Sequence, residues 1–254
     1  MTDALYPTLA SRVVFVSGGA SGIGAAIVRA FARNHAKIAF VDLLSEAGRA
    51  LEEELAAAGE TARFFPCDVT DVDALRRWIK ETRAALGPIA VLVNNAADDE
   101  RHDLDAVTPD YWDHAQNVNL RHHFFAAQAV HSQMRELGFG SIINLSSIAW
   151  RAGAAEMPAY SAAKAGVVGL THALARAFGA DNIRVNAIEP GAVMTERQRR
   201  LWYKTPEQVE AIVKRQLIRA TLIAEDVARV ALFLGADDSR MITKQSIVVD
   251  AGLR

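Results

Sequence analysis

The stretch VVFVSGGASGIGAAIVRAFARN, residues 13–34, decides the fold. Its apolar start at residues 13–16 predicts a buried strand, and the apolar periodicity after residue 24 predicts a helix. A strand, a glycine-rich turn and a helix in this order are typical of a dinucleotide site, because glycine lets backbone N–H groups approach a pyrophosphate. The residues of this turn that we expect to bind the cofactor are Gly18, Ser21, Gly22, Ile23 and Gly24.

Asp42 follows a second predicted strand at residues 37–41 and lies 18 residues after Gly24. A carboxylate there can accept hydrogen bonds from the adenosine ribose of NAD and repel the 2′-phosphate of NADP. The two leucines that come next offer no basic group for that phosphate. Asp42 could also cap the helix predicted at residues 46–55, and the two roles are compatible. We therefore predict NAD as the cofactor.

Strands and helices alternate along the rest of the chain. Further strands are predicted at residues 62–65, 89–93, 141–145 and 183–188, with helices at 71–86, 109–137 and 158–178, the second of these long or broken. Such alternation predicts an α/β fold: a single doubly wound Rossmann domain over residues 1–254, with a parallel sheet and helices on both faces. One irregular insert, at about residues 195–217, is predicted to be a mobile lid over the substrate.

Composition narrows the class of protein. The 254 residues are 51% hydrophobic, enough for one large core, and the net charge of -2 gives no basic face for nucleic acid. Cys67 is the only cysteine, which excludes an intramolecular disulfide and a cysteine-based zinc site, and no histidine spacing predicts a metal. With no leader pattern and no apolar run of 18 residues, we expect a cytoplasmic protein without a membrane partner.

Tyr160 and Lys164 are the first candidates for catalysis. They are four residues apart in a helix that Pro158 is expected to open, so they share a face, and Ser147 follows the strand at residues 141–145. An ammonium about 4 Å from the phenol would lower its pKa by about three units at an effective dielectric of about 20. Taken alone, a tyrosine and a lysine at this spacing are more often a solvated pair on the surface of a helix. The rival pattern S-x-x-K at Ser161 lacks its S-D-N and K-T-G partners.

Together these motifs resemble the short-chain dehydrogenase/reductase family along nearly the whole chain. The matching positions are SGGASGIG at 17–24, Asp68-Val69, NNAA at 94–97, Asn119, Ser147, Tyr160, Lys164 and PGAVMT at 190–195. Two positions depart from the pattern, since Ser17 stands for the usual threonine and Ala97 for the usual glycine. Ser17 keeps the hydroxyl, so neither departure argues against activity.

The resemblance implies a role for each of these residues. Tyr160 is then the general acid/base, Ser147 binds the reacting oxygen, and Lys164 holds the nicotinamide ribose and lowers the pKa of Tyr160. Asn119 holds a water in a proton relay from Lys164. The other implied cofactor contacts are Asp68 and Val69 at the adenine, Asn95 and Ala96 at the cofactor floor, Val193 and Thr195 at the carboxamide, and Pro190 and Gly191. The hydride chemistry belongs to the cofactor.

A narrower resemblance points to bacterial NAD-dependent aldose 1-dehydrogenases of the D-xylose dehydrogenase kind. It rests on Tyr6-Pro7-Thr8-Leu9, residues 98–102, Tyr111-Trp112-Asp113, Asn119-Leu120-Arg121-His122, residues 147–150, Arg197-Gln198, Trp202-Tyr203 and residues 250–254. Such enzymes oxidise the anomeric hydroxyl of a cyclic sugar to a lactone. The expected substrate contacts, besides Ser147 and Tyr160, are Asp99, Arg101, Trp150, Arg151, Arg197 and Trp202.

Alternatives stay open at this level. The arginines Arg151, Arg197, Arg199 and Arg200 would suit a sugar acid, such as a 2-keto-3-deoxy acid oxidised at a secondary hydroxyl, because a guanidinium matches a carboxylate bidentately. A ketoreductase of acyl-carrier-protein substrates would prefer NADP, which Asp42 opposes, and a sensor of NAD without turnover would not need Ser147, Tyr160 and Lys164. The family resemblance also implies a homotetramer, paired through helices at 110–137 and 158–178 and through the C-terminal strand.

Overall fold

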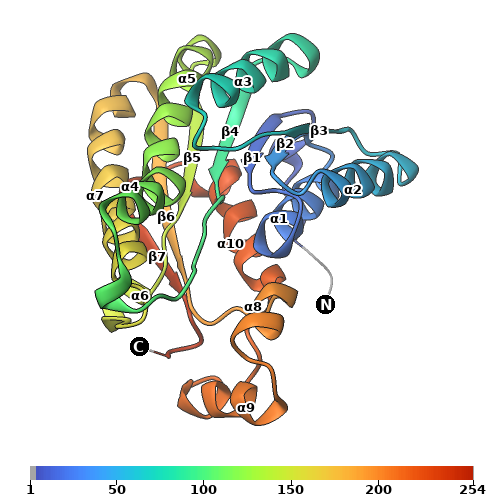
Figure 1. Cartoon of the computed structure of the whole chain (residues 1–254). Helices are drawn as coiled ribbons and strands as arrows, with labels where there is room; N and C mark the ends of the chain where they lie inside the picture. Colours follow the sequence, from blue (N-terminus) through green and yellow to red (C-terminus); the bar gives the residue numbers. More distant parts are fainter. Residues whose placement is uncertain (1–3, 254) are drawn as a thin grey trace.

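A single seven-stranded parallel sheet forms the centre of the molecule (Figure 1). The computed structural model describes residues 4–253, so Arg254 of the terminal motif lies outside the described residues. The strand order is β3-β2-β1-β4-β5-β6-β7. The strands are β1 (Val13–Ser17), β2 (Lys37–Asp42), β3 (Ala62–Pro66), β4 (Ile89–Asn94), β5 (Gly140–Leu145), β6 (Ile183–Pro190) and β7 (Ser246–Val249).

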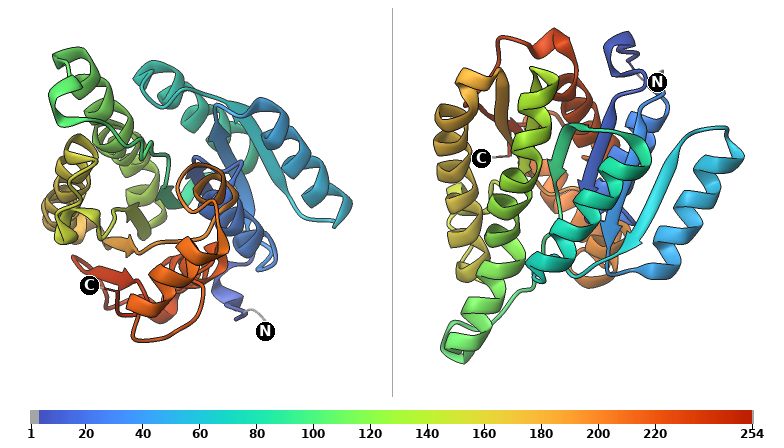
Figure 2. Two further views of the ribbon diagram at one scale, coloured as in Figure 1. Left: turned by 60° about the horizontal axis from the view of Figure 1, so that its bottom comes forward. Right: turned by 90° about the horizontal axis from the view of Figure 1, so that it is seen from above.

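Helices cover both faces of this sheet (Figure 2). The chain forms α1 (Gly22–Ala32), α2 (Ser45–Ala57), α3 (Val72–Leu86), α4 (Pro109–Gln116), α5 (His122–Leu137), α6 (Ala149–Ala152), α7 (Pro158–Phe178), α8 (Glu196–Leu201), α9 (Pro206–Arg215) and α10 (Ala224–Gly235). Single 3₁₀ turns lie at Pro7–Leu9, Leu104–Ala106, Gly179–Asp181 and Asp237–Ser239. The predicted α/β architecture is confirmed.

Two apolar cores explain why these elements stack in three layers. Val14 and Val16 of β1 belong to the core that also holds α1, α2 and α10, whereas Val13 and Phe15 belong to the core with α3, α5 and α7. Side chains of a strand alternate between its faces, so a central strand that is apolar at its first four positions must be covered on both sides.

The strand order reverses between β1 and its two neighbours, β2 and β4. In open α/β sheets, ligands bind beyond the carboxyl ends of the strands at such a switch point. The glycine-rich turn follows β1, Asp42 ends β2, and Asn94 ends β4. The fold therefore brings the predicted cofactor residues to one edge of the sheet.

The helix predicted at 109–137 is broken, as that prediction allowed. A π-helical turn at Asn117–Arg121 separates α4 from α5 and carries Asn119. Such turns are rare and are frequently found at functional sites. Here the turn directs the Asn119 side chain into the protein, where only 1% of the residue is exposed.

The segment at 195–217 is not irregular throughout, since it contains α8 and α9, and α9 lies apart from the sheet in Figure 1. Helix α10, which packs on α1 beside the sheet, was not predicted. Within residues 4–253, no helix combines the length and the apolar character needed to cross a membrane.

Candidate active site

Ser17 and Asn95 join the glycine-rich turn to the end of β4. The Ser17 hydroxyl accepts hydrogen bonds from the backbone N–H groups of Asn95 and Ala96 at 3.1 and 3.2 Å. The Asn95 amide donates to the Gly18 carbonyl at 2.8 Å. Gly18 has φ +67°, and a Cβ there would lie 2.7 Å from the Ala96 Cα, so a larger residue does not fit. Serine thus supplies the hydroxyl that the usual threonine would.

The first turn of α1 is open to an anion. Its N-cap residue, Ser21, makes no side-chain capping bond, so its hydroxyl leaves the first N–H groups of the helix unpaired. A Cβ on Gly22 would lie 3.3 Å from the Thr195 methyl group, which places the start of the 195–217 segment beside this turn. The turn therefore fits the pyrophosphate of a dinucleotide.

Asp42 presents both carboxylate oxygens at the end of β2. One accepts from the Ala20 N–H at 2.9 Å and the other from the Leu44 N–H at 3.0 Å. These bonds fix the carboxylate while each oxygen keeps capacity for a ribose hydroxyl. Leu43 and Leu44 are exposed and apolar, so they offer nothing for a 2′-phosphate.

The remaining predicted cofactor residues end the neighbouring strands. Asp68 accepts from the Thr70 N–H and hydroxyl, both at 2.8 Å, and Val69 is buried. After β6, Gly191 packs so closely on Asp250 that a Cβ would lie 2.7 Å from the Asp250 Cβ. Val193 is buried, and Thr195 caps α8 by accepting from the Gln198 N–H at 3.3 Å. The structure places these residues at the same edge of the sheet.

Ser147, Tyr160 and Lys164 meet where β5 ends against α7. Helix α7 begins at Pro158, as predicted, so Tyr160 and Lys164 lie one turn apart. The Ser147 hydroxyl accepts a hydrogen bond from the Ala149 N–H at 3.1 Å, and it lies close enough to Tyr160 to lower the pKa of the phenol. The Lys164 ammonium donates to the Leu145 carbonyl at 2.8 Å and lies 5.5 Å from the centre of the Tyr160 ring. Only 1% of Lys164 is exposed.

The expectation that Lys164 lowers the pKa of Tyr160 is wrong for the polypeptide by itself. Burial raises the pKa of Tyr160, the carboxylates of Asp99 and Asp98 raise it further, and only the Ser147 hydrogen bond lowers it. Burial also lowers the pKa of Lys164 to about 7, and its ammonium faces a backbone carbonyl. Loss of hydration is therefore the largest influence on the pKa of both groups.

Asn119 contacts the backbone of the loop after β4. Its amide oxygen accepts from the Asp98 N–H at 2.9 Å, and its NH₂ group donates to the Asp98 and Ala115 carbonyls at 3.1 and 2.9 Å. The side chain is thus committed to holding this loop against the π-helical turn. The water relay implied by the family resemblance stays a prediction.

The predicted substrate residues fall into two groups. Asp99, Arg101, Arg197 and Trp202 come together where the 195–217 segment meets the loop after β4. There the Arg101 guanidinium lies 4.6 Å from the centre of the Trp202 ring and 3.7 Å from the Glu156 carboxylate.

Trp150 and Arg151 form the second group and contact Glu189 at the end of β6. Arg151 donates to both oxygens of that carboxylate at 2.6 and 2.8 Å, and the Trp150 indole donates at 3.0 Å. Ser246 also donates to Glu189. Because Glu189 is fully buried, it requires a cation, and Arg151 supplies it.

Sequence reasoning missed three residues of this region. Gln198 donates to Asp99, Asp98 pairs with Arg197, and Glu189 organises the second group. Glu189 had a usable signal, since a carboxylate at the end of an apolar strand must find a partner. Asp98 and Gln198 belong to the motifs of the narrower resemblance, but nothing in the sequence indicated which side chains they contact.

Comparison with known proteins supports the same class. A family model described as enoyl-(acyl carrier protein) reductase matches residues 18–254. The chain is 49% identical to a probable galactose dehydrogenase, GalD, of Rhizobium meliloti, over all of this chain and 99% of that protein. It is 44% identical to a D-xylose 1-dehydrogenase of Caulobacter vibrioides over the full length of both. A 3-oxoacyl-[acyl-carrier protein] reductase from Brucella melitensis superposes with a TM-score of 0.89 at 32% identity, covering 100% of this chain and 97% of that one.

The fold, the glycine-rich turn and the Ser147, Tyr160 and Lys164 arrangement define a dinucleotide-dependent oxidoreductase. The chain belongs to the short-chain dehydrogenase/reductase family. Its cofactor is accordingly a nicotinamide dinucleotide.

Proposed function

We propose that this protein oxidises the anomeric hydroxyl of a neutral aldose to a lactone, with NAD as the cofactor. The names of the galactose and xylose dehydrogenase relatives support a sugar substrate. One observation about this chain favours a neutral sugar over a sugar acid. Of the four arginines that sequence analysis offered for a substrate carboxylate, Arg151 and Arg197 are already paired with carboxylates of the protein, and Arg199 and Arg200 are exposed on α8.

The geometry of these pairs supports a neutral sugar. Arg151 has both ends of its guanidinium fork on Glu189, which is fully buried. Arg197 donates to Asp98 at 2.6 Å and to Asp99 at 3.2 Å. A sugar acid that bound Arg151 or Arg197 would have to displace its pair, and its carboxylate would then meet Glu189 or Asp98 and Asp99, which costs free energy. Hydroxyl groups of a neutral sugar can donate to these carboxylates instead.

In this proposal each catalytic residue has a defined role. Tyr160 accepts the proton of the anomeric hydroxyl, and the Ser147 hydroxyl holds the same oxygen in place. When bound, the oxidised nicotinamide supplies the acceptor for the hydride that leaves C1, so the C1–O bond becomes a carbonyl. Lys164 holds the nicotinamide ribose, and Asn119 holds a water in the relay that carries the proton onward from Lys164. The 195–217 segment acts as the lid that excludes solvent.

Asp42 supports NAD rather than NADP. Both of its oxygens are held at the end of β2 by backbone N–H groups, next to two apolar residues. A 2′-phosphate would meet a fixed negative charge without a cation to offset it. Assembly as a homotetramer and a cytoplasmic location stay predictions.

A matched pair of substrates tests the proposed function. D-galactose and D-galacturonate differ in a hydroxymethyl group against a carboxylate, and kcat/KM with NAD should favour the neutral sugar by about 100-fold or more, about 2.7 kcal/mol. D-xylose, D-glucose and a 2-keto-3-deoxy acid extend the panel. A preference for either acid, or no NADH formation from any aldose, contradicts the proposal. Tyr160→Phe is the control for turnover at this site.

A further inference from the structure

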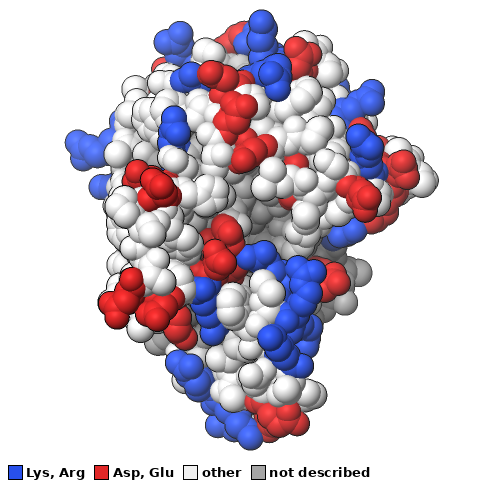
Figure 3. Space-filling view, viewed as in Figure 1, with Lys and Arg blue, Asp and Glu red and all other residues white. Residues whose placement is uncertain are grey.

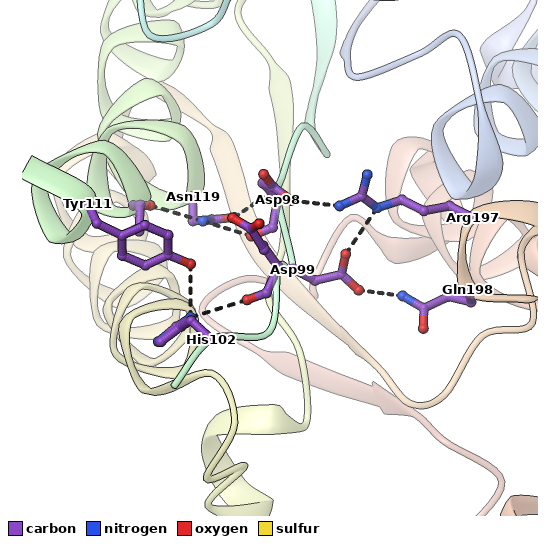
Figure 4. A network of polar contacts seen from close by, with 9 residues as sticks. Asp98, Asp99, His102, Tyr111, Asn119, Arg197 and Gln198 are labelled. Carbon is purple, nitrogen blue, oxygen red and sulfur yellow. Dashed lines mark hydrogen bonds and ion pairs between the residues drawn. The ribbon is translucent and has the colours of Figure 1, made fainter. Parts of the chain in front are cut away.

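Two groups of polar side chains flank the catalytic residues, and they differ in exposure. In the first group, Arg197 and Gln198 of α8 bind Asp98 and Asp99 (Figure 4). The Arg197 and Asp98 side chains are 46% and 43% exposed, and Figure 3 shows acidic and basic side chains side by side over α8. Exposed ion pairs of this kind contribute little. The second group surrounds Glu189, whose side chain is fully buried, so its contacts matter far more.

The Glu189 carboxylate binds four hydrogen-bond donors. One oxygen accepts from the Trp150 indole at 3.0 Å and from the Arg151 Nε at 2.6 Å. The other accepts from the second nitrogen of the Arg151 fork at 2.8 Å and from the Ser246 hydroxyl of β7. An ionised carboxylate offers about four acceptor positions in all. Glu189 therefore has no capacity left for a substrate, and its role is to hold these donors.

Helix α6 depends on these contacts for its position. It has only four residues, and none of them is buried, so apolar packing holds it weakly. A helix this short is not stable by itself. Its second and third residues, Trp150 and Arg151, are the ones that donate to Glu189. The buried carboxylate therefore anchors α6 to the end of β6.

The start of α6 in turn fixes the Ser147 hydroxyl. Ala149, the first residue of the helix, donates its N–H to the Ser147 Oγ at 3.1 Å. The Ile148 N–H between them donates to the Pro190 carbonyl at 3.1 Å, next to Glu189 in β6. A serine hydroxyl has one proton to donate and two acceptor positions. With one acceptor position taken by the Ala149 N–H, the oxygen is held in place and its proton stays free for the reacting oxygen.

We propose that Glu189 is a positioning residue for catalysis, which sets the Ser147 hydroxyl through α6. Trp150 and Arg151 then serve the reaction as anchors of α6 and do not bind the substrate. Ser246 joins the last strand to the same network. The inference rests on the proposed role of Ser147 in holding the reacting oxygen. A misplacement of about 1 Å in such a group can cost about 10²-fold in rate.

Ser246→Ala tests this role, because it removes one of the four donors and keeps the Arg151 ion pair. With the best aldose, kcat should fall by about fivefold or more while the KM for NAD stays unchanged. Ser246→Thr keeps the hydroxyl and should restore most of kcat. Ser141→Ala is the matched control, since the Ser141 hydroxyl makes a buried hydrogen bond to the Leu234 carbonyl at 2.8 Å near the start of β5, away from Ser147. It should leave kcat unchanged.

A second background shows whether the network acts through Ser147. In Ser147→Ala, the change Ser246→Ala should lower kcat no further, because the hydroxyl to be positioned is already absent. An equal loss in both backgrounds, or none in either, would overturn the inference. A wild-type protein that oxidises no aldose contradicts the proposed function instead. Hydrogen exchange of residues 147–152 then still decides: it should be about threefold faster or more in Ser246→Ala and unchanged in Ser141→Ala. Unchanged exchange in Ser246→Ala would refute the anchoring of α6.

Discussion

At the scale of single residues, the central feature is a phenol whose surroundings oppose its ionisation. Burial and the carboxylates of Asp99 and Asp98 raise the pKa of Tyr160, and the Ser147 hydrogen bond lowers it. In the proposed oxidation, the phenol is the proton acceptor. The rate of oxidation should therefore rise with pH as the phenolate forms, and an oxidised nicotinamide would add the positive charge that the protein alone lacks.

Replacement of Tyr160 by phenylalanine should abolish the proton step but not cofactor binding. General acid/base catalysis contributes about 10²–10⁴-fold, so kcat should fall by that factor. The dissociation constant for NADH, measured by fluorescence, should stay within about threefold because the ring remains. A variant that keeps more than about a tenth of wild-type kcat would contradict the role of Tyr160.

Replacement of Asp42 by alanine should weaken the preference for NAD. The lost hydrogen bonds to a ribose involve a charged acceptor, so kcat/KM with NAD should fall by about 10- to 100-fold. The ratio of kcat/KM for NAD to that for NADP should move toward one. An unchanged ratio would show that other residues select the cofactor, and wild-type protein that prefers NADP would contradict the prediction of NAD.

These residues differ in how far sequence can locate them. Tyr160, Lys164 and Asp42 follow from spacing along one element, which the helix and strand periods fix. The partners of Arg151 and Arg197 do not, because Glu189 and Asp98 are distant in sequence and only the fold brings them together. The error about the pKa of Tyr160 has the same origin, since burial depends on packing from several elements.

At the scale of elements, the loop after β5 is fixed to the end of β6. The Ile148 N–H donates to the Pro190 carbonyl at 3.1 Å, and Trp150 and Arg151 of α6 donate to Glu189. Ser147 lies two residues before the start of α6, so these contacts hold the loop that carries its hydroxyl. Arg151 therefore helps to hold the loop of Ser147 in place, because its guanidinium binds the buried Glu189 carboxylate.

Replacement of Arg151 by methionine should destabilise the protein. It leaves the buried Glu189 carboxylate without its cation, and the free energy of unfolding at pH 7 should fall by about 2 kcal/mol, a value reduced because Arg151 is partly exposed. Urea unfolding measures this loss. Arg200→Met, an exposed arginine, is the control and should change it by less than about 0.5 kcal/mol. A loss of substrate affinity without a loss of stability would contradict this structural role and would indicate that Arg151 binds the substrate.

The stability lost in Arg151→Met should also depend on pH. Burial opposes the charge of Glu189, but its bonds to Arg151, Ser246 and Trp150 hold its pKa below the usual value. A lowered pKa in the folded state gives stability that is present above the unfolded pKa and is lost as the pH falls through the folded one. The difference in stability between wild type and Arg151→Met should therefore narrow in acid. A constant difference would contradict the pairing.

Helix α10 shows why one element escaped prediction. Its N-cap is Ile223, a residue type that does not cap helices, and instead the Ile223 N–H donates to the Asp226 carboxylate at 3.1 Å. The start signal on which sequence reading depends is therefore missing. The alternating strands carry strong apolar runs and were located to within one or two residues.

At the scale of the whole molecule, the last strand leaves an edge and an apolar surface uncovered. Strand β7 pairs only with β6 in the described part of the chain, and all four of its residues are partly exposed. Leu217 and Ile218 nearby are 84% and 67% exposed. Open sheet edges and apolar patches of this kind are commonly covered in an assembly.

We predict a homotetramer, in which β7 and its apolar surroundings form one of the contacts. Light scattering at micromolar protein should give four times the chain mass. Leu217→Glu should shift the mass toward dimers or monomers, because it places a charge in an apolar contact. Met241→Glu is the matched control at an equally exposed apolar side chain. A wild-type monomer would contradict this prediction.

The central claim is oxidation at the anomeric carbon, and isotope transfer tests it most directly. The best aldose of the substrate panel, carrying deuterium only at C1, is turned over with NAD, and the reduced cofactor is examined by mass spectrometry. Oxidation at C1 moves that deuterium to the cofactor, and the product is a lactone. The account predicts a reduced cofactor heavier by one mass unit. A reduced cofactor without deuterium would mean that another hydroxyl is oxidised, which would contradict the claim.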